Sequence, residues 1–194
     1  MEFESYQKYR WFLTKSKKIV VGGRSAVQNE ELLKSLKKQN SDLIVMHTSS
    51  PGSPFAVIIS SIKEVSESDI EQTAVFTACF SRNWRDGKEN STVDIFKLSQ
   101  LYKGKKMKTG TWGVKGDIKH KKVKIELVLT TQKDILRAVP PTTPDKKSIL
   151  LRLSPGKIDK NSIVPKMALE LHDTFNQEAI LSALPPGGIK IKRK

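Results

Sequence analysis

Residues 19–30, with the sequence IVVGGRSAVQNE, most constrain how this chain can fold. The apolar residues predict a short strand, Gly22-Gly23 a tight turn with close backbone approach, and Ser25 a helix N-cap. Gln28 follows in capping-box register. A helix that begins here directs unpaired N–H groups and a partial positive charge toward whatever Arg24 faces. The segment is therefore predicted to suit an anion, although a structural turn with a solvated arginine is the simpler interpretation.

Composition limits the classes of protein to consider. The 194 residues carry a formal net charge of +15, and the length suits one domain or a domain with a small companion. No apolar run approaches the roughly 18–20 residues of a membrane-spanning helix, and the N-terminus does not read as a signal peptide. One cysteine excludes an internal disulfide, and three scattered histidines offer no zinc-ligand spacing. We expect a cytoplasmic protein with no membrane association, metal or cofactor, and with a polyanion as its partner.

The positive charge is concentrated in one stretch of the chain. Residues 63–90 are slightly acidic, whereas residues 190–194 form a basic tail. Between residues 103 and 124 there is one acid, Asp117, and there are nine lysines: Lys103, Lys105, Lys106, Lys108, Lys115, Lys119, Lys121, Lys122 and Lys124. A solvated hairpin would explain this stretch, but such clustering is also what an electrostatic footprint on a nucleic acid requires, and we favour the second explanation.

Hydrophobic spacing predicts an α+β fold. Five segments have helical spacing and are predicted as helices: 3–12, 26–38, 66–79, 162–173 and 177–184. Apolar runs or period-two alternation predict strands at 18–21, 43–47, 55–59, 93–95, 112–114, 123–129 and 148–153. The alternation puts Lys115, Lys122 and Lys124 on a solvent face, and residues 81–87 are predicted to be a polar loop.

These elements predict a mixed or mostly antiparallel sheet with helices packed on one side, followed by a small C-terminal α/β extension. We place a core domain at residues 1–131 and the extension with its basic tail at 132–194. The extension is too small to be expected to fold alone, so we expect it to pack on the core.

Short motifs follow one another in a fixed order along the chain. They are GGR at 22–24, QNE at 28–30, His47-Thr48 with Pro51-Gly52-Ser53, Ser81 with Trp84, Thr109-Gly110-Thr111-Trp112 with Lys115-Gly116, and ALPPGG at 183–188. In this order they resemble the motifs of the NFACT-R family of RNA-binding domains. The ending is similar to that of archaeal members. The resemblance extends from about residue 6 to the C-terminus.

NFACT-R is the C-terminal module of the RqcH-type ribosome quality-control factors. The resemblance implies an α+β fold and binding of structured RNA, ribosomal or tRNA, with ribosomal RNA of the large subunit favoured, in translation quality control. The N-terminal domain and coiled coil of the long factors are not in this sequence. It therefore resembles a free-standing NFACT-R protein, whose partners would include the large ribosomal subunit and a separate protein that supplies the N-terminal domain.

Several site residues have two explanations. His47 ends a strand beside a Pro-Gly turn, so it either hydrogen-bonds the turn or contacts RNA. Trp84 is flanked by Arg82 and Arg85 in the predicted loop, so it is either buried or a platform for base stacking. Gln28 and Asn29 either bind RNA or tie the helix to the turn at residues 51–52. We favour a functional Arg24 and a structural Asn29.

No Ser/His/Asp, Cys/His or paired-carboxylate set can be assembled, so we assign no catalytic residue and predict that the chain is not an enzyme. The alternatives to ribosome-directed RNA binding are a general nucleic-acid or DNA-binding protein and, less favoured, an enzyme that modifies nucleic acid. The predicted RNA-binding residues are Gly22, Gly23, Arg24, Gln28, Asn29, His47, Arg82, Trp84, Arg85, Lys103, Lys105, Lys106, Lys108, Lys115, Lys122 and Lys124.

Overall fold

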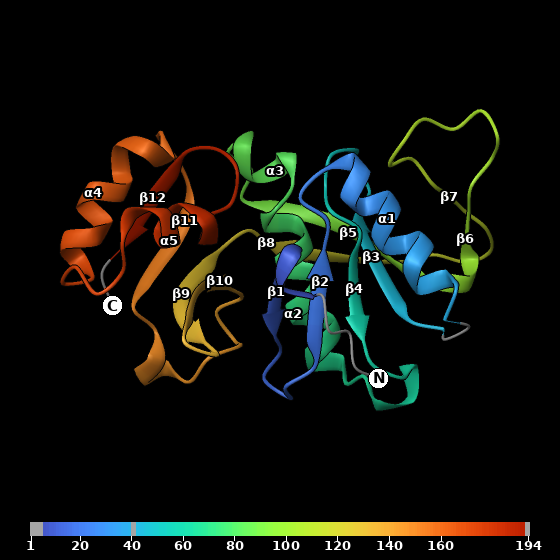
Figure 1. Cartoon of the computed structure of the whole chain (residues 1–194), viewed down its shortest axis with the longest axis horizontal. Coiled ribbons are helices and arrows are strands. Elements are labelled where there is room, and N and C mark those ends of the chain that lie inside the picture. Colours follow the sequence, from blue (N-terminus) through green and yellow to red (C-terminus); the bar gives the residue numbers. More distant parts are fainter. Residues whose placement is uncertain (1–5, 40–41, 193–194) are drawn as a thin grey trace.

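Two antiparallel β-sheets form the framework of the computed structural model, which describes residues 6–39 and 42–192 (Figure 1). Within these residues the first sheet has six strands in the order β1-β2-β4-β3-β5-β8, and the second has four in the order β10-β9-β11-β12. Strands β6 and β7 form a separate short ribbon. The strands are β1 (Arg10–Leu13), β2 (Ile19–Gly22), β3 (Ile44–Thr48), β4 (Ala56–Ile59), β5 (Asn90–Lys97), β6 (Leu101–Tyr102), β7 (Gly113–Val114), β8 (Lys119–Lys124), β9 (Leu127–Gln132), β10 (Ile135–Val139), β11 (Leu151–Ile158) and β12 (Ile189–Lys192).

Helices accompany both sheets, so the α+β prediction is confirmed. Figure 1 shows the first sheet with α1 and α2 on the right of the molecule and the second sheet with α4 and α5 on the left. Helix α3 lies in the segment that we predicted to be a loop. The α-helices of the described residues are α1 (Ala26–Lys37), α2 (Glu67–Cys79), α3 (Arg82–Arg85), α4 (Lys160–Glu170) and α5 (Gln177–Ala183).

The first sheet is covered by helices on both faces, not on one side as predicted. Leucines of α1 pack in one hydrophobic cluster with Val45 of β3 and Val57 of β4. The adjacent residues Met46 and Ile58 pack with α2 in another cluster. Successive side chains of a strand point to opposite faces, so α1 and α2 lie on opposite sides of the sheet. Strands β3 and β4 are apolar on both faces, and both faces therefore need a cover.

The first described segment contains a strand where we predicted a helix. Tyr6–Lys8 form one turn of 3₁₀ helix, and Arg10–Leu13 form β1, which pairs with β2. The aromatic residues fit helical spacing, but Trp11 and Phe12 join different hydrophobic clusters on opposite faces. Pairing with β2 therefore overrides the local pattern. The part of the predicted helix before residue 6 lies outside the described residues.

The predicted strand over 123–129 is divided between the two sheets. β8 ends at Lys124 and β9 begins at Leu127, so the chain passes from one sheet to the other at residues 125–126. One hydrophobic cluster nevertheless runs from Met46 of β3 through Ile125 to Leu151 of β11. The boundary that we predicted at residue 131 falls inside β9. The division into a core domain and an extension remains a prediction, but the two sheets share a core.

Candidate nucleic-acid interface

A groove of about 750 Å³, which we call the main groove, crosses the end of the first sheet where β2 and β3 finish and β4 begins. Four segments form most of its lining: the turn at 23–26, the end of β3 with the turn that follows it at 47–55, α3 with the residues before it, and the loop at 109–112. Other lining residues are Arg10, Asn29, Asp94, Phe96, Val114 and Pro186. These segments carry the GGR, His-Thr, Ser-x-x-Trp and Thr-Gly-Thr-Trp motifs. The fold therefore brings together motifs that are far apart in the sequence.

The glycine–arginine turn is organised by its own hydrogen bonds. Ser25 caps α1 by accepting a hydrogen bond from the Gln28 N–H at 3.2 Å, and Gln28 Oε1 accepts from the Arg24 N–H at 3.0 Å. Asn29 is buried, and its Oδ1 accepts from the Phe55 N–H at 3.2 Å. The side-chain amide oxygens of Gln28 and Asn29 thus already accept hydrogen bonds within the protein.

Gly23 is required for close approach and not for a positive φ. The glycines with positive φ in the described chain do not include Gly22 or Gly23. A Cβ on Gly23 would instead collide with the Asn29 side chain, and one on Gly22 would lie 3.0 Å from Pro54 Cβ. The Arg24 side chain is exposed on the main groove, and partial desolvation lowers its pKa. Arg24 is therefore the residue of this turn that is available to a ligand.

His47 lies at the end of β3, directly before the second turn. Its Nδ1 lies 2.7 Å from the Thr48 carbonyl oxygen, which can only accept, so Nδ1 carries the proton. The ring packs on Phe55 with the ring centroids 4.5 Å apart. Burial lowers the pKa of His47, so the imidazole is neutral at pH 7. His47 lines the main groove as a neutral group that the turn holds in place.

Trp84 is buried and cannot stack on a base in this structure. Its side chain is 1% exposed, and Nε1 donates to the Gly188 carbonyl oxygen at 3.0 Å. Gly187 has φ 111°, and a Cβ there would lie 2.7 Å from Arg85 Cα. The Pro-Gly-Gly segment therefore docks tightly on α3. This packing leaves Arg82 and Arg85 exposed on the main groove.

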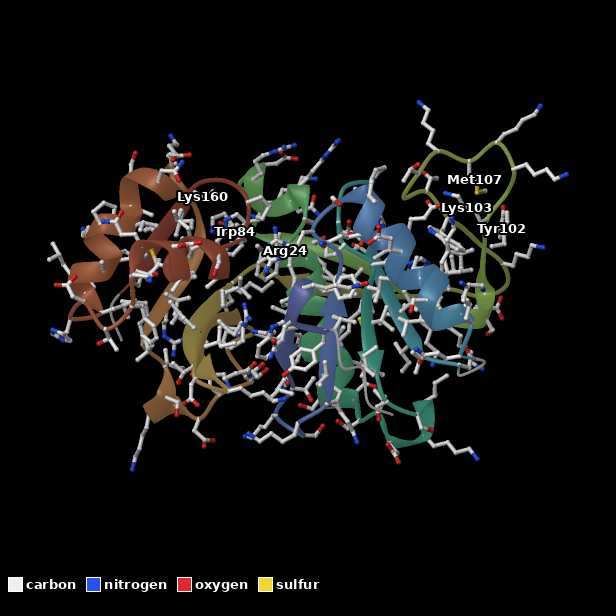
Figure 2. The ribbon with its side chains drawn as sticks, in the orientation of Figure 1. Arg24, Trp84, Tyr102, Lys103, Met107 and Lys160 are labelled. Atoms are coloured by element: carbon white, nitrogen blue, oxygen red, sulfur yellow. The ribbon has the colours of Figure 1, made fainter. Side chains whose placement is uncertain are left out.

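Lys103 is an anchor of the segment that we call the lysine loop, residues 103–112. Its Nζ donates to Glu30 Oε2 at 2.6 Å and to two loop carbonyl oxygens, those of Lys108 and Thr111, at 2.8 and 3.0 Å. The three N–H donors of the ammonium group are thus used. Figure 2 shows the loop extending from the body, with Lys103 and Met107 inside its curve. Lys103 positions the loop and is not free to bind RNA.

The other predicted lysines are directed to solvent. Lys105, Lys106 and Lys108 are exposed, and none forms an ion pair with a carboxylate of the described chain. Lys115 lies over the Tyr102 ring, with Nζ 5.0 Å from the centroid. These lysines extend the positive surface from the main groove along the lysine loop.

Lys122 and Lys124 are exposed to solvent, as the alternation predicts, and lie on the face of β8 opposite Val123, which packs with α2. On the neighbouring strand β5, Lys122 is paired with Thr92 and Lys124 with Asn90. Thr92 and Asn90 lie on the same face of β5 as Asp94, which lines the main groove. Lys124 pairs with Glu126 at 2.8 Å, whereas Lys122 forms no ion pair with a described carboxylate. Lys122 is therefore the freer cation of the two.

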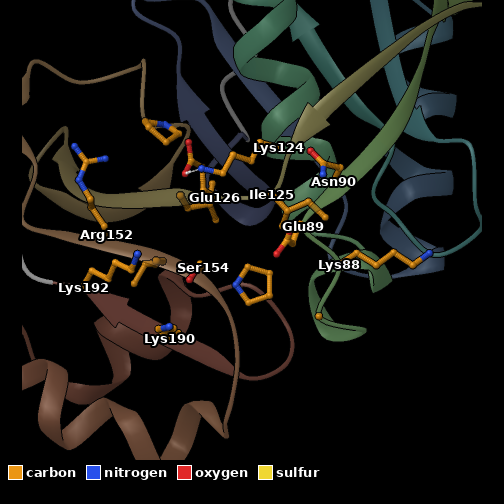
Figure 3. A pocket seen from close by; sticks show the side chains of 15 residues that line it. Lys88, Glu89, Asn90, Lys124, Ile125, Glu126, Arg152, Ser154, Lys190 and Lys192 are labelled. Carbon is orange, nitrogen blue, oxygen red and sulfur yellow. Dashed lines mark ion pairs between the residues drawn. The ribbon is translucent and has the colours of Figure 1, made fainter.

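A second groove, of about 550 Å³, lies between β8 and the second sheet (Figure 3). Basic residues of the second sheet, Arg152, Lys190 and Lys192, line it across from the Lys124–Glu126 ion pair. Of the predicted basic tail, Lys190 and Lys192 belong to β12, and residues 193–194 lie outside the described part. Sequence analysis missed this groove, because its residues are far apart in the chain and no local pattern joins them.

Ser49, Asp94 and His120 lie together but are not arranged as a catalytic triad. Ser49 Oγ donates to Asp94 Oδ1, and His120 Nδ1 lies 2.8 Å from the same oxygen. The carboxylate thus lies between the hydroxyl and the imidazole, whereas nucleophile activation needs the imidazole in that position. Within residues 6–39 and 42–192, no group of three or more His, Cys, Asp or Glu residues could hold a metal ion. No helix in the same residues is long and apolar enough to cross a membrane.

Comparison with known proteins identifies the class of this domain. Residues 8–116 match the model of the NFACT protein RNA binding domain. The archaeal Rqc2 homolog aRqcH of Methanocaldococcus jannaschii is 31% identical over 97% of this chain, and the chain spans 29% of the length of that relative. The chain therefore belongs to the NFACT RNA-binding domain family.

A solved structure supports the fold. The C-terminal part of the fibronectin/fibrinogen-binding protein from Streptococcus suis superposes with a TM-score of 0.51 at 19% sequence identity. The match covers 77% of this chain and 50% of that one. The matched family model begins before β1 and ends just after β7, so it includes the four motif-bearing segments of the main groove but not Pro186, which also lines it.

Proposed function

We propose that this chain binds structured RNA through the main groove and the lysine loop, and that it does so on the large ribosomal subunit in translation quality control. The observation that carries the proposal is the convergence of four motif-bearing segments on one groove with exposed Arg24, Arg82 and Arg85. Family membership supports RNA as the ligand. The name of the M. jannaschii relative, an Rqc2 homolog, supports the ribosome quality-control role.

The two parts of this surface have different tasks in the proposal. Lys105, Lys106 and Lys108 neutralise backbone phosphates and provide affinity that depends on salt and little on sequence. Arg24 and Arg82 offer planar guanidinium groups that can bind a phosphate in bidentate fashion and fix its orientation. The neutral His47 and Trp112 line the same groove, where RNA bases or riboses would lie.

The experiment that tests the proposal is crosslinking of the tagged protein to RNA in cells, followed by sequencing and by sedimentation of the lysate. Crosslinks concentrated on large-subunit ribosomal RNA, with the protein in the ribosomal fractions, support the proposal. Crosslinks scattered over unrelated RNA, or binding that a DNA duplex of equal length competes equally well, favour the general nucleic-acid-binding alternative. The variant with Lys105, Lys106 and Lys108 changed to Gln is the control for specific crosslinking.

We also propose that the chain is a cytoplasmic binding module and not an enzyme. The purified protein is expected neither to hydrolyse nucleotides nor to cleave nucleic acid above background. Turnover that disappears in Arg24→Ala or His47→Ala would contradict this part of the proposal. Proteins that co-purify with the tagged chain test the expectation of a separate partner that carries the N-terminal domain.

A further inference from the structure

Three arginines from distant parts of the chain meet at the junction between the two sheets. Arg10 begins β1, Arg24 follows β2, and Arg137 lies on β10, and all three line one small cleft. The cleft has room for about 10 Å³, which is the space of about one water-sized group. Arg10 and Arg24 also line the main groove, so the cleft adjoins it. Figure 2 shows Arg24 in the middle of the molecule, between the two sheets.

Two of these guanidinium groups are held on aromatic faces. Arg137 Cζ lies 4.1 Å from the ring centroid of Trp11, and Arg10 Cζ lies 4.8 Å from that of Phe80. Both aromatic residues also line the cleft. Stacking on a ring fixes the guanidinium plane and leaves its N–H edge free to donate. The arginines are therefore oriented before any ligand arrives.

The arginine cluster, Arg10 with Arg24 and Arg137, has no anionic partner among residues 6–39 and 42–192, since none of the three forms an ion pair with a carboxylate there. Arg137 is only 9% exposed, and its buried Nε has no hydrogen-bond partner. A buried donor without a partner and a buried charge without a counter-ion are both unfavourable.

The electrostatics agree with this geometry. Desolvation, and then repulsion from Arg24, lower the pKa values of Arg10 and Arg137 to about 10. Both groups are still charged at pH 7, so like charges are held together in a partly desolvated place. Tyr6 is the other titratable group that acts on Arg137, and its hydroxyl is already hydrogen-bonded to Lys133. An anion that entered the cleft would relieve both the repulsion and the unsatisfied donor.

We propose that the arginine cluster is a phosphate subsite, in which one non-bridging oxygen of a phosphate enters the cleft while the rest of the group stays in the main groove. The size of the cleft admits one oxygen and not a whole phosphate. Arg137 and Arg10 donate to that oxygen, and Arg24 covers the phosphate from the groove side. The identification of the phosphate as part of RNA rests on the proposed function, whereas the subsite itself does not. The subsite depends on the second sheet, because Arg137 lies on β10. Arg137 is also outside residues 8–116, which the family model matches.

The test compares the wild type with Arg137→Met and with Lys63→Met, a control that removes an exposed charge between β4 and α2. Thermal unfolding is measured in phosphate and in chloride at equal ionic strength. Affinity is measured for a hairpin RNA with a 5′-phosphate and for the same RNA with a 5′-hydroxyl. In chloride, Arg137→Met is expected to melt at or above the wild-type temperature, because methionine still packs on Trp11 while a repelled charge is removed. A structural role for Arg137 predicts a lower melting temperature instead.

Phosphate is expected to raise the melting temperature of the wild type and of Lys63→Met more than that of Arg137→Met. RNA affinity is expected to fall about ten- to hundredfold in Arg137→Met, the scale of a charge-assisted hydrogen bond. An equal loss for both RNAs identifies a backbone phosphodiester as the ligand, and a loss confined to the 5′-phosphorylated RNA identifies a terminal phosphate.

The two proposals fail separately. Full RNA affinity and a wild-type response to phosphate in folded Arg137→Met would overturn the subsite and leave the proposed function standing. A phosphate response that depends on Arg137, in a wild type that binds no RNA, would keep the subsite and overturn the proposed function. If Arg137→Met does not fold, Arg24→Met provides the same comparison from an exposed position, and its unchanged affinity and phosphate response would overturn the subsite.

Discussion

Lys103 donates to the Glu30 carboxylate across 2.6 Å, and this ion pair joins the lysine loop to α1. The same carboxylate accepts a hydrogen bond from the Gly110 N–H at 2.7 Å and pairs with Lys34 at 2.9 Å. Gly110 has φ 79° and lies against Ala26, where a Cβ would collide. One acidic residue in α1 therefore determines where the exposed lysines of the loop are held.

Replacing Glu30 with Gln is expected to lower the melting temperature at pH 7 and to loosen the lysine loop. Hydrogen bonds from Lys103, Gly110 and Lys34 hold the pKa of Glu30 at about 2, below its ordinary value of 4.5. Because the folded state favours the ionised form, this contribution is present above pH 4.5 and disappears as the pH falls through about 2. The difference in melting temperature between wild type and Glu30→Gln should therefore shrink across that interval.

The matched control is Glu31→Gln, which removes an exposed carboxylate from the next position of the same helix. Its melting temperature at pH 7 is expected to be close to that of the wild type, because the Glu31 side chain is exposed. Hydrogen exchange of the loop amides supplies the local readout, with faster exchange in Glu30→Gln alone. A Glu30→Gln protein whose loop exchanges as slowly as the wild type would show that other contacts hold the loop.

Changing Lys105, Lys106 and Lys108 together to Gln is expected to weaken RNA binding and leave stability unchanged. The three side chains are exposed and form no ion pair within the described chain, so folding does not depend on them. If each neutralises one phosphate, the slope of log K against log salt should become less negative by about 2 to 3. Binding measured between low and physiological salt gives this slope.

A second triple variant controls for net charge alone. Lys63, Lys146 and Lys166 are exposed and lie away from the lysine loop, and changing them to Gln removes the same formal charge. This variant should keep most of the wild-type slope. Equal slopes in the two triple variants would mean that the affinity comes from overall charge and not from the lysine loop.

The local parts of the fold follow from the sequence. Leu32, Leu33 and Leu36 at helical spacing, after the Ser25 cap, predict α1 correctly, and the structure shows these leucines buried. The first segment was mistaken for a helix, because aromatic spacing allows both structures and only the pairing with β2 decides. The continuous apolar run of β4 does indicate that both faces of the sheet are covered. It does not identify α1 and α2 as the helices that cover them.

The parts of the candidate site that are formed by local turns could be predicted from the sequence. The parts that depend on contacts between residues far apart in the chain could not. Family motifs identified the segments around Gly23 and His47, which the fold brings to one groove. The clustering of lysines predicts Lys103 as an RNA-binding residue. Nothing in residues 103–124 reveals that the ammonium group of Lys103 is bound to the Glu30 carboxylate. Arg10 and Arg137 were missed for the same reason, since their shared cleft exists only when the two sheets pack together.

Trp84→Phe is expected to lower the melting temperature and to leave the RNA affinity of the folded protein unchanged. Phenylalanine keeps most of the buried ring but lacks the donor to the Gly188 carbonyl oxygen, which then keeps only the hydrogen bond from the Gly156 N–H. The expected cost is that of one net hydrogen bond, about 1 kcal/mol, measured by chemical denaturation. A loss of affinity at full stability would restore base stacking as the role of Trp84.

Arg24 and Asn29 are expected to separate binding from folding within one turn. Arg24→Ala removes an exposed guanidinium group, so the melting temperature should stay nearly unchanged while RNA affinity falls by about 1–3 kcal/mol. Asn29→Ala leaves the Phe55 N–H buried without an acceptor and should cost about 1–3 kcal/mol of stability. Denaturation curves and affinity measured at a fixed concentration of folded protein distinguish the two effects.

Gln28→Ala completes the comparison, because the Gln28 side chain accepts from the Arg24 N–H near the surface and not in the core. Its loss of stability should be smaller than that of Asn29→Ala, and its affinity should fall only as far as Arg24 becomes less well positioned. A stably folded Arg24→Ala protein with full RNA affinity would remove Arg24 from the binding surface. The binding role would then pass to Arg82 and Arg85 across the same groove, and the double variant of these two arginines would be the next measurement.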